Sequence, residues 1–132
     1  MAAKLLIYHM EDARMQAAEG LCAVLGIQPV RTDASEAGIP IGLLTGTADI
    51  RTPGTLPADQ ERPEPAAIDE EMVVMSGFTK QQFDAFLDGL KEMSLRIGLK
   101  AVETPFNRNW SGEMLQAELK REREEFRKRC AT

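Results

Sequence analysis

Two short, uninterrupted apolar runs constrain the fold of this chain more than any other feature of its sequence. Residues 4–9 contain the run Leu-Leu-Ile-Tyr, and residues 71–76 contain the run Met-Val-Val-Met. No charged residue interrupts either of these four-residue runs. Runs of this length without alternation are typical of β-strands that are buried on both faces. They are too short to span a membrane or to form the core of a signal peptide. Both runs are therefore predicted to be central strands of a sheet.

A helix is predicted after each run. In the first half, Asp12 has the position of an N-cap and Gly26 that of a C-terminal stop. In the second half, Thr79 and Gln82 have the spacing of a capping box. The apolar residues between these ends recur every three or four positions, as in a helix with one buried face: Met15, Ala18, Leu21, Cys22 and Leu25, and then Phe83, Phe86, Leu87 and Leu90.

A second, more polar strand is expected after each helix, at residues 27–32 and 99–104. Pro29 has no backbone N–H, which places the first of these strands at a sheet edge. A helical turn is predicted within residues 39–46, and a long helix with Ser111 as its N-cap closes the chain. The order of elements is thus the same in both halves, which is a weak internal repeat.

The predicted fold class is α/β: a small four-stranded sheet of order 2-1-3-4, built from two β-α-β halves, with helices on both faces. Right-handed crossovers make each half parallel. If the halves also run parallel to each other, the sheet is doubly wound. The alternative is a two-layer α+β fold with a mixed sheet. Apolar residues on both faces of the central strands favour the first arrangement.

The chain is predicted to be a single domain over residues 1–132, since domains cluster around ~100–150 residues. Residues 1–50 form the first half and residues 68–132 the second half with a charged C-terminal helix. Between them, residues 51–67 hold four of the seven prolines and are predicted to be a linker or a long extended loop.

The net charge of −5 at pH 7 argues against general binding to nucleic acid or to a membrane surface. The two cysteines, Cys22 and Cys130, form no pair or cluster with metal-ligand spacing, so neither a metal site nor a bound cofactor is expected. Nothing in the sequence indicates secretion, and a cytoplasmic location is predicted.

The second half contains Gly77-Phe78, the helical segment Phe83-Asp84-Ala85-Phe86-Leu87, and the strand Leu99-Lys100-Ala101-Val102. Thr104-Pro105-x-Asn107-Arg108-x-Trp110 follows, and residues 113–119 continue the pattern. Over residues 71–125 the chain resembles a bacterial family of small proteins defined as a domain of unknown function, DUF3783. The resemblance implies an α/β domain and a bacterial, cytosolic source, and it implies no activity.

The all-parallel arrangement would bring the carboxyl ends of all four strands to one rim, where ligands bind in open α/β sheets. The backbone N–H groups that open the second helix, at Thr79 to Gln82, would favour a small anion there. The side chain of Arg31 or Arg108 could add positive charge. Each residue also has a simpler interpretation as part of a turn, a cap or a hydrophobic staple. The candidate ligand-binding residues are His9, Arg31, Ser76, Gly77, Thr79, Thr104, Asn107, Arg108 and Trp110.

Three functions are compatible with this sequence. The first is a non-catalytic ligand-binding or regulatory module that holds a small anionic ligand or a protein partner. The second is a protein–protein adaptor that uses the linker and the charged C-terminal helix. The third is a small enzyme with His9, the only histidine, as a general base. No catalytic constellation is recognised, so the first function is favoured.

Overall fold

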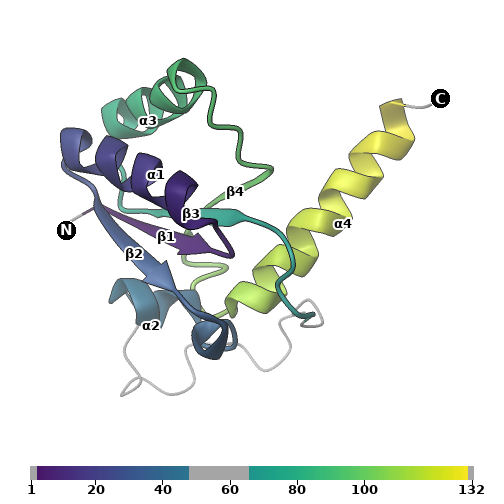
Figure 1. Ribbon diagram of the computed structural model, residues 1–132. Coiled ribbons are helices and arrows are strands. Elements are labelled where there is room, and N and C mark those ends of the chain that lie inside the picture. The colour runs from purple at the N-terminus through teal and green to yellow at the C-terminus, as the bar shows by residue number, and fades with distance from the viewer. Residues whose placement is uncertain (1–2, 48–65, 131–132) are drawn as a thin grey trace.

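The computed structural model describes residues 3–47 and 66–130, so most of the proline-rich segment 51–67 lies outside the described residues. Within them, four strands form one sheet in the order β2-β1-β3-β4. The strands are β1 (Lys4–Tyr8), β2 (Gln28–Thr32), β3 (Met72–Ser76) and β4 (Leu99–Val102). The predicted strand order is confirmed, with the two apolar runs in the centre (Figure 1).

The sheet is mixed, and the favoured all-parallel arrangement is wrong. β1 is parallel to β2, and β3 is parallel to β4, as expected for two β-α-β units. β1 and β3, however, are antiparallel, with Lys4 opposite Ser76 and Tyr8 opposite Met72. The pairing between the halves thus follows the alternative arrangement, a mixed sheet.

Both faces of this sheet are nevertheless covered, as predicted. Helices α1 (Asp12–Leu25) and α3 (Lys80–Glu92) lie side by side on one face (Figure 1). The short helix α2 (Ile41–Thr45) and the first part of α4 (Gly112–Cys130) cover the other face. A 3-10 helix, η1 (Ala34–Glu36), connects β2 to α2. The strands therefore bury apolar residues on both sides without being parallel, which is why their composition did not reveal their direction.

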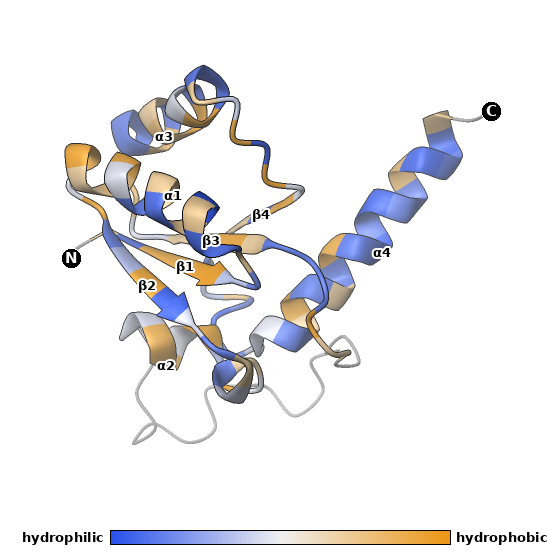
Figure 2. Ribbon diagram, viewed as in Figure 1, coloured by the Kyte–Doolittle hydropathy of each residue, from blue (hydrophilic) through white to orange (hydrophobic). Residues whose placement is uncertain are grey.

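Alternate side chains of the central strands build two separate cores. On the α1–α3 face, Leu5, Ile7 and Val73 pack with residues of those helices, including Cys22 and Phe86. The opposite core contains Leu6, Tyr8, Met72, Val74, Ile41, Trp110 and Leu115. Figure 2 shows the apolar strand β1 in orange, between α1 and α2.

Three of the four predicted helix caps are confirmed, those at Gly26, Thr79 and Ser111, and one, at Asp12, is wrong. The Thr79 hydroxyl accepts from the Gln82 N–H at 3.0 Å, and the Gln82 side chain accepts from the Thr79 N–H at 3.0 Å. Gly26 ends α1 in the left-handed conformation, with φ of 73°. Asp12 is not the N-cap of α1, because Glu11 holds that position and makes no side-chain capping bond.

The C-terminal helix α4 begins where Ser111 Oγ accepts from the Met114 N–H at 3.2 Å. Leu115 and Gln116 are buried, whereas the last turns extend away from the sheet and are mainly hydrophilic (Figures 1 and 2). Within residues 3–47 and 66–130, no helix is both long and apolar enough to span a membrane.

Candidate functional site

The antiparallel pairing of β1 and β3 separates the residues that were predicted to share one rim. Tyr8 lies opposite Met72, so His9 follows β1 at the end of the sheet where β3 begins. Ser76 lies at the opposite end of the sheet, beside Lys4. The single rim is therefore wrong: His9 and Arg31 lie towards one end, and Ser76, Gly77, Thr79, Thr104 and Asn107 towards the other.

At the Ser76 end, one carboxylate gathers three hydroxyl groups from both halves of the chain. Glu103 accepts hydrogen bonds from Ser76 Oγ at 2.6 Å, Thr47 Oγ1 at 2.8 Å and Thr45 Oγ1 at 3.0 Å. Ser76 and Thr45 are buried. This hydroxyl–carboxylate cluster places a negative charge where the sequence predicted an anion, so it disfavours that ligand at this end.

The remaining predicted residues at this end have local structural roles. Gly77 has φ of 69°, a conformation that suits glycine in the turn between β3 and α3. The Thr104 N–H donates to Asn107 Oδ1 at 2.8 Å, and Asn107 Nδ2 donates to the Val102 carbonyl at 3.1 Å. These contacts agree with the simpler interpretation of both motifs as a cap and a turn.

Arg31, Arg108 and Trp110 do not join a common pocket either. Arg31 forms two hydrogen bonds with the Glu19 carboxylate, at 2.6 and 2.9 Å, which hold the pKa of Glu19 below its usual value. Trp110 is buried in the second core, and its ring makes an edge-to-face contact with the ring of Phe106, with the ring centroids 5.5 Å apart. The Arg108 Nε and Trp110 Nε1 atoms are buried without a hydrogen-bond partner in the described part of the chain.

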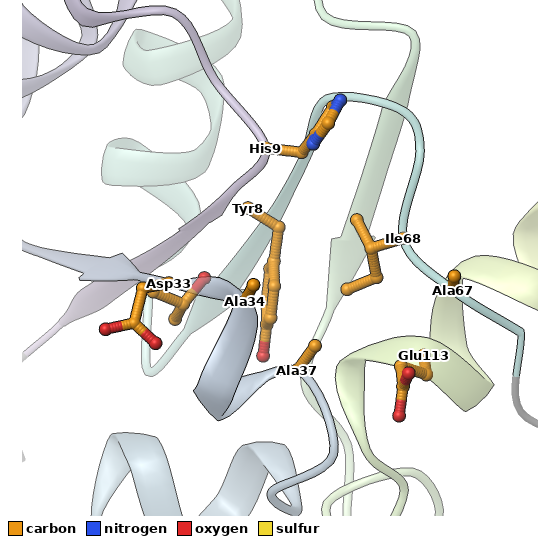
Figure 3. A pocket seen from close by; sticks show the side chains of 9 residues that line it. Tyr8, His9, Asp33, Ala34, Ala37, Ala67, Ile68 and Glu113 are labelled. Carbon is orange, nitrogen blue, oxygen red and sulfur yellow. The ribbon is translucent and has the colours of Figure 1, made fainter.

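At the His9 end, a small pocket lies between the two halves of the chain (Figure 3). Its volume is about 240 Å³. His9 is exposed at this pocket and adopts φ of 54°, which is unusual for a residue other than glycine. Residues from β1, the η1 region, the segment before β3 and the start of α4 line it: Tyr8, His9, Thr32, Asp33, Ala34, Ala37, Ala67, Ile68 and Glu113.

Tyr8 forms one wall of this pocket, which we call the Tyr8 pocket. Its side chain is 1% exposed, and its hydroxyl has no hydrogen-bond partner among the described residues. Burial raises the pKa of this hydroxyl above its usual 10.0, and the nearby charges of Glu36 and Glu103 raise it further. Tyr8 is therefore a neutral, unpaired hydroxyl at neutral pH. Sequence analysis missed it because a tyrosine inside an apolar run is typical of a core residue.

A larger pocket, of about 760 Å³, lies between α3 and the start of β4. We call it the α3–β4 pocket. Apolar groups of Leu87, Leu90, Leu95 and Ile97 contribute to its lining. The exposed cationic residues Lys91, Arg96 and Lys100 also line it, together with Ser94 and Gly98.

The loop that carries Arg96 is held by backbone and side-chain contacts. Ser94 has φ of 54°, and Leu95 N–H donates back to the Leu90 carbonyl at 2.9 Å, which closes the end of α3. Arg14 donates to the Arg96 carbonyl and also forms an ion pair with Glu71 at 2.7 Å. The basic lining thus lies on a braced segment.

The α3–β4 pocket was not predicted from the sequence, because it does not lie at the carboxyl ends of parallel strands, where ligands of open α/β sheets are expected. The available signal was local: three cationic residues and no acid except Glu92 occur in residues 91–100 of a chain whose net charge is −5. The spacing of these cations follows neither a helix nor a strand, so only the loop geometry brings them together.

Comparison with known proteins gives a match for part of the second half of the chain. No curated protein and no solved structure matches it. The resemblance noted in the sequence is confirmed for one segment. Residues 71–126, which hold β3, α3, β4, most of α4 and every residue lining the α3–β4 pocket, match the family model described as Domain of unknown function (DUF3783).

Proposed function

We propose that this protein is a non-catalytic binding module whose α3–β4 pocket holds a small anionic ligand with an apolar body. The observation that carries the proposal is the composition of this pocket. Three cations, Lys91, Arg96 and Lys100, surround apolar side chains, and no carboxylate is among the residues that line it. The proposal keeps the anionic ligand expected from the sequence and assigns it to a different place.

Electrostatics support an anion at this pocket. Lys100 Nζ donates to the Ile97 carbonyl at 2.8 Å, which is a neutral partner, so its charge is not cancelled by that contact. Lys91 and Arg96 form no side-chain ion pair within the described residues. Cations without acidic partners attract an anion more strongly than cations in ion pairs, because the field is not neutralised locally.

The apolar side chains support a ligand that is more than a bare anion. Leu90, Leu95 and Ile97 are buried in the α1–α3 core, and their edges also line the pocket. Ligand sites commonly combine an apolar lining with a few polar groups that fix orientation. A short alkyl carboxylate or alkyl phosphate satisfies both parts, with its chain on the leucines and its head at the cations.

Isothermal titration calorimetry with octanoate tests this proposal directly. We expect saturable binding of octanoate, weaker binding of acetate, and no comparable binding of octylamine. The variant Lys91→Gln/Arg96→Gln/Lys100→Gln should bind octanoate at least about tenfold more weakly, because charge-assisted contacts contribute more than neutral ones.

A matched control removes three exposed cations outside the pocket, in Lys80→Gln/Arg127→Gln/Lys128→Gln, and keeps the same net charge as the test variant. Equal weakening in both variants would show that only overall charge matters. Failure of octanoate and octyl phosphate to bind, or equal binding of octanol, would contradict the proposed ligand class.

We keep the bacterial cytoplasm as the expected location. Both cysteines are free thiols, with Cys22 buried and Cys130 exposed. Thiols of this kind persist in reducing compartments, which supports the expectation drawn from the resemblance.

The adaptor function remains a second candidate because of one observation on α4. Phe126, near the end of that helix, is 67% exposed although it is a large apolar residue. Exposed aromatic residues are enriched at protein contacts. If α4 docks a partner of its own kind, sedimentation should show a dimer that Phe126→Ser converts to a monomer; a monomeric wild-type protein would remove self-association from this candidate.

A further inference from the structure

The strand β4 has an outer edge with which no described strand pairs. It is the last strand in the order β2-β1-β3-β4. The Glu103 N–H donates to the Met75 carbonyl at 2.8 Å, so the backbone groups of every second residue along β4 point to β3. The N–H and C=O groups of Lys100 and Val102 therefore point the other way, to the free edge. Such an edge can pair with one more strand.

The backbone groups at this edge are available for pairing. The Val102 carbonyl accepts from Asn107 Nδ2 at 3.1 Å, whereas the Val102 N–H and both backbone groups of Lys100 have no partner among the described residues. The opposite edge of the sheet is different, because β2 contains Pro29, which has no N–H to offer a further strand. β4 contains no proline, so it is the edge that can accept a strand.

Two pockets flank β4 on its two faces, and their charges are opposite. The α3–β4 pocket is lined by Lys91, Arg96 and Lys100 and by no carboxylate. A smaller pocket of about 320 Å³ lies between β4 and α4, and we call it the β4–α4 pocket. Its charged lining residues are Glu118 and Glu122, and no cation lines it. The sign of the local charge therefore changes from one face of this strand to the other.

The rest of the β4–α4 pocket is mainly apolar. Phe106 is 59% exposed there. Glu118 is paired with Arg121, whereas Glu122 forms no ion pair within the described residues. A long basic side chain suits this lining, because its aliphatic stem can pack on apolar groups while its charge meets Glu122. The apolar lining residues are Ala101, Val102, Phe106, Trp110, Leu115 and Leu119.

A second copy of this chain is a poor partner for this edge. Two β4 strands paired across a two-fold axis would place the α1–α3 faces of both copies on the same side of one continuous sheet. The cations of both copies, Arg96 and Lys100 among them, would then lie on that side and repel each other. Lysine on an edge strand is known to discourage such pairing. A strand with acidic side chains on this face is attracted instead.

We propose that the outer edge of β4 is a docking site for an extended segment of another protein in which acidic and basic side chains alternate. Side chains of a strand point alternately to its two faces. The acidic side chains enter the α3–β4 pocket, and the basic side chains enter the β4–α4 pocket. The proposal rests on the anion preference proposed above for the α3–β4 pocket and adds the peptide backbone and the second pocket.

The probe is the peptide acetyl-Val-Glu-Arg-Glu-Arg-Val-amide, whose acidic side chains share one face of the strand and whose basic side chains share the other. The control, acetyl-Val-Arg-Glu-Glu-Arg-Val-amide, has the same composition and charge but carries both signs on each face. By calorimetry we expect saturable binding of the probe at millimolar concentrations or below. The control should bind at least about tenfold more weakly, because each of its faces brings like charges together at a pocket.

Strand pairing itself is tested on the backbone. When the probe is bound, the Val102 N–H should exchange with deuterium more slowly, because it becomes hydrogen-bonded. Two N-methylated forms of the probe, one methylated on both glutamates and the other on both arginines, should differ. One form loses the N–H groups that face β4 and should not bind, whereas the other loses N–H groups that face solvent and should bind almost as well as the probe.

Three variants of the protein assign the contacts. Val102→Pro removes the outward N–H and no bond to β3, so it should abolish probe binding while the edge strand tolerates it. Glu122→Gln should weaken probe binding about tenfold. Glu124→Gln is the matched control, because it removes an exposed carboxylate of the same helix that lines neither pocket. All three should bind octanoate like the wild type, since none of these residues lines the α3–β4 pocket.

The proposal is overturned if the probe does not bind, if the control peptide binds equally well, or if the two N-methylated forms behave alike. It is also overturned if Glu124→Gln weakens probe binding as much as Glu122→Gln. The N-methyl comparison uses the wild-type chain, so it decides the question even if Val102→Pro fails to fold. Octanoate binding without probe binding contradicts the docking site alone, and probe binding without octanoate binding contradicts the small-ligand function alone.

Discussion

Gly112 lies against the ring of Tyr8 so closely that a β-carbon at position 112 would be 2.5 Å from Cε1 and 2.8 Å from Cζ of that ring. The contact joins the first residue of α4 to the last residue of β1. Tyr8 is packed on its other sides by the second core, so it has little room to move. The absence of a side chain at position 112 is therefore what lets α4 begin beside the Tyr8 pocket.

We predict that Gly112→Ala destabilises the protein by about 1–3 kcal/mol, because overpacking against a buried ring costs more than helix propensity gains. Gly20→Ala is the matched control: Gly20 is an exposed residue within α1, and a β-carbon there would meet no atom within 4 Å. That variant should gain about 0.5–1 kcal/mol. Urea unfolding measures both, and stabilisation by both substitutions would contradict the close contact.

His9 adopts the left-handed conformation with φ of 54° directly after β1. This conformation costs an L-residue about 1–2 kcal/mol, whereas glycine adopts it freely at some cost in unfolded-state entropy. His9→Gly should therefore raise the free energy of unfolding by about 0.5–1 kcal/mol, and His9→Ala should not raise it. Equal stability changes for the two variants, measured by thermal unfolding, would indicate that the backbone at His9 is not strained.

The two thiols are predicted to differ sharply in reactivity. Cys22 is fully buried in the α1–α3 core, and burial raises its thiol pKa to about 11, with the charge of Glu19 adding to the effect. Cys130 is exposed. Because the thiolate is the reactive form, the folded protein at pH 8 should react with a disulfide reagent at one thiol per chain, which mass spectrometry should locate at Cys130. Denaturant should expose the second thiol, and rapid reaction of Cys22 in the folded chain would contradict this core.

Much of the fold could be predicted because local signals and long-range packing agree. The uninterrupted apolar runs identified β1 and β3 as central strands, and Pro29 placed β2 at an edge. The capping box of Thr79 and Gln82 located the start of α3. Each of these signals concerns burial of a side chain or a hydrogen bond between residues close in sequence. Both can be inferred from the local sequence alone.

The direction of β3 relative to β1 could not be predicted in the same way. Leu6 opposite Val74 would be buried on the same face in either direction, so the apolar pattern is identical for both arrangements. The antiparallel choice puts α1 and α3 on one face and leaves the other face to α2 and α4.

The candidate sites were less predictable because they depend on that direction. His9 was singled out and does line a pocket, but its partners there are Tyr8 and Glu113 rather than Ser76 or Asn107. Glu113 had been considered only as part of the family-like helix. A side chain becomes part of a site through neighbours that are distant in sequence, and an all-parallel sheet would give these residues different neighbours from those of the mixed sheet.

The unpaired hydroxyl of Tyr8 leads to a final prediction, on Tyr8→Phe. Removal of a buried hydroxyl normally costs stability because a hydrogen bond is lost, but here no bond within the described structure would be lost. At pH 7 the variant should therefore be as stable as the wild type or more stable by up to about 1 kcal/mol. Urea unfolding at fixed temperature measures the difference, and a loss of more than about 1 kcal/mol would mean that the hydroxyl has a partner such as a buried water.

The difference in unfolding free energy between the wild type and Tyr8→Phe is predicted to change at alkaline pH. The pKa of Tyr8 is raised above 10.0 in the folded chain, so above pH 10 the folded state retains a proton that the unfolded state releases. The unfolded state then binds fewer protons, and the stability of the wild type falls as the pH rises through and beyond this value. Tyr8→Phe lacks this titration, while the Cys22 thiol titrates in both proteins and cancels in the comparison. The variant should therefore gain stability relative to the wild type between pH 9 and pH 11, as measured by urea unfolding. A constant difference in unfolding free energy across that range would show that the hydroxyl of Tyr8 titrates as it does in the unfolded chain.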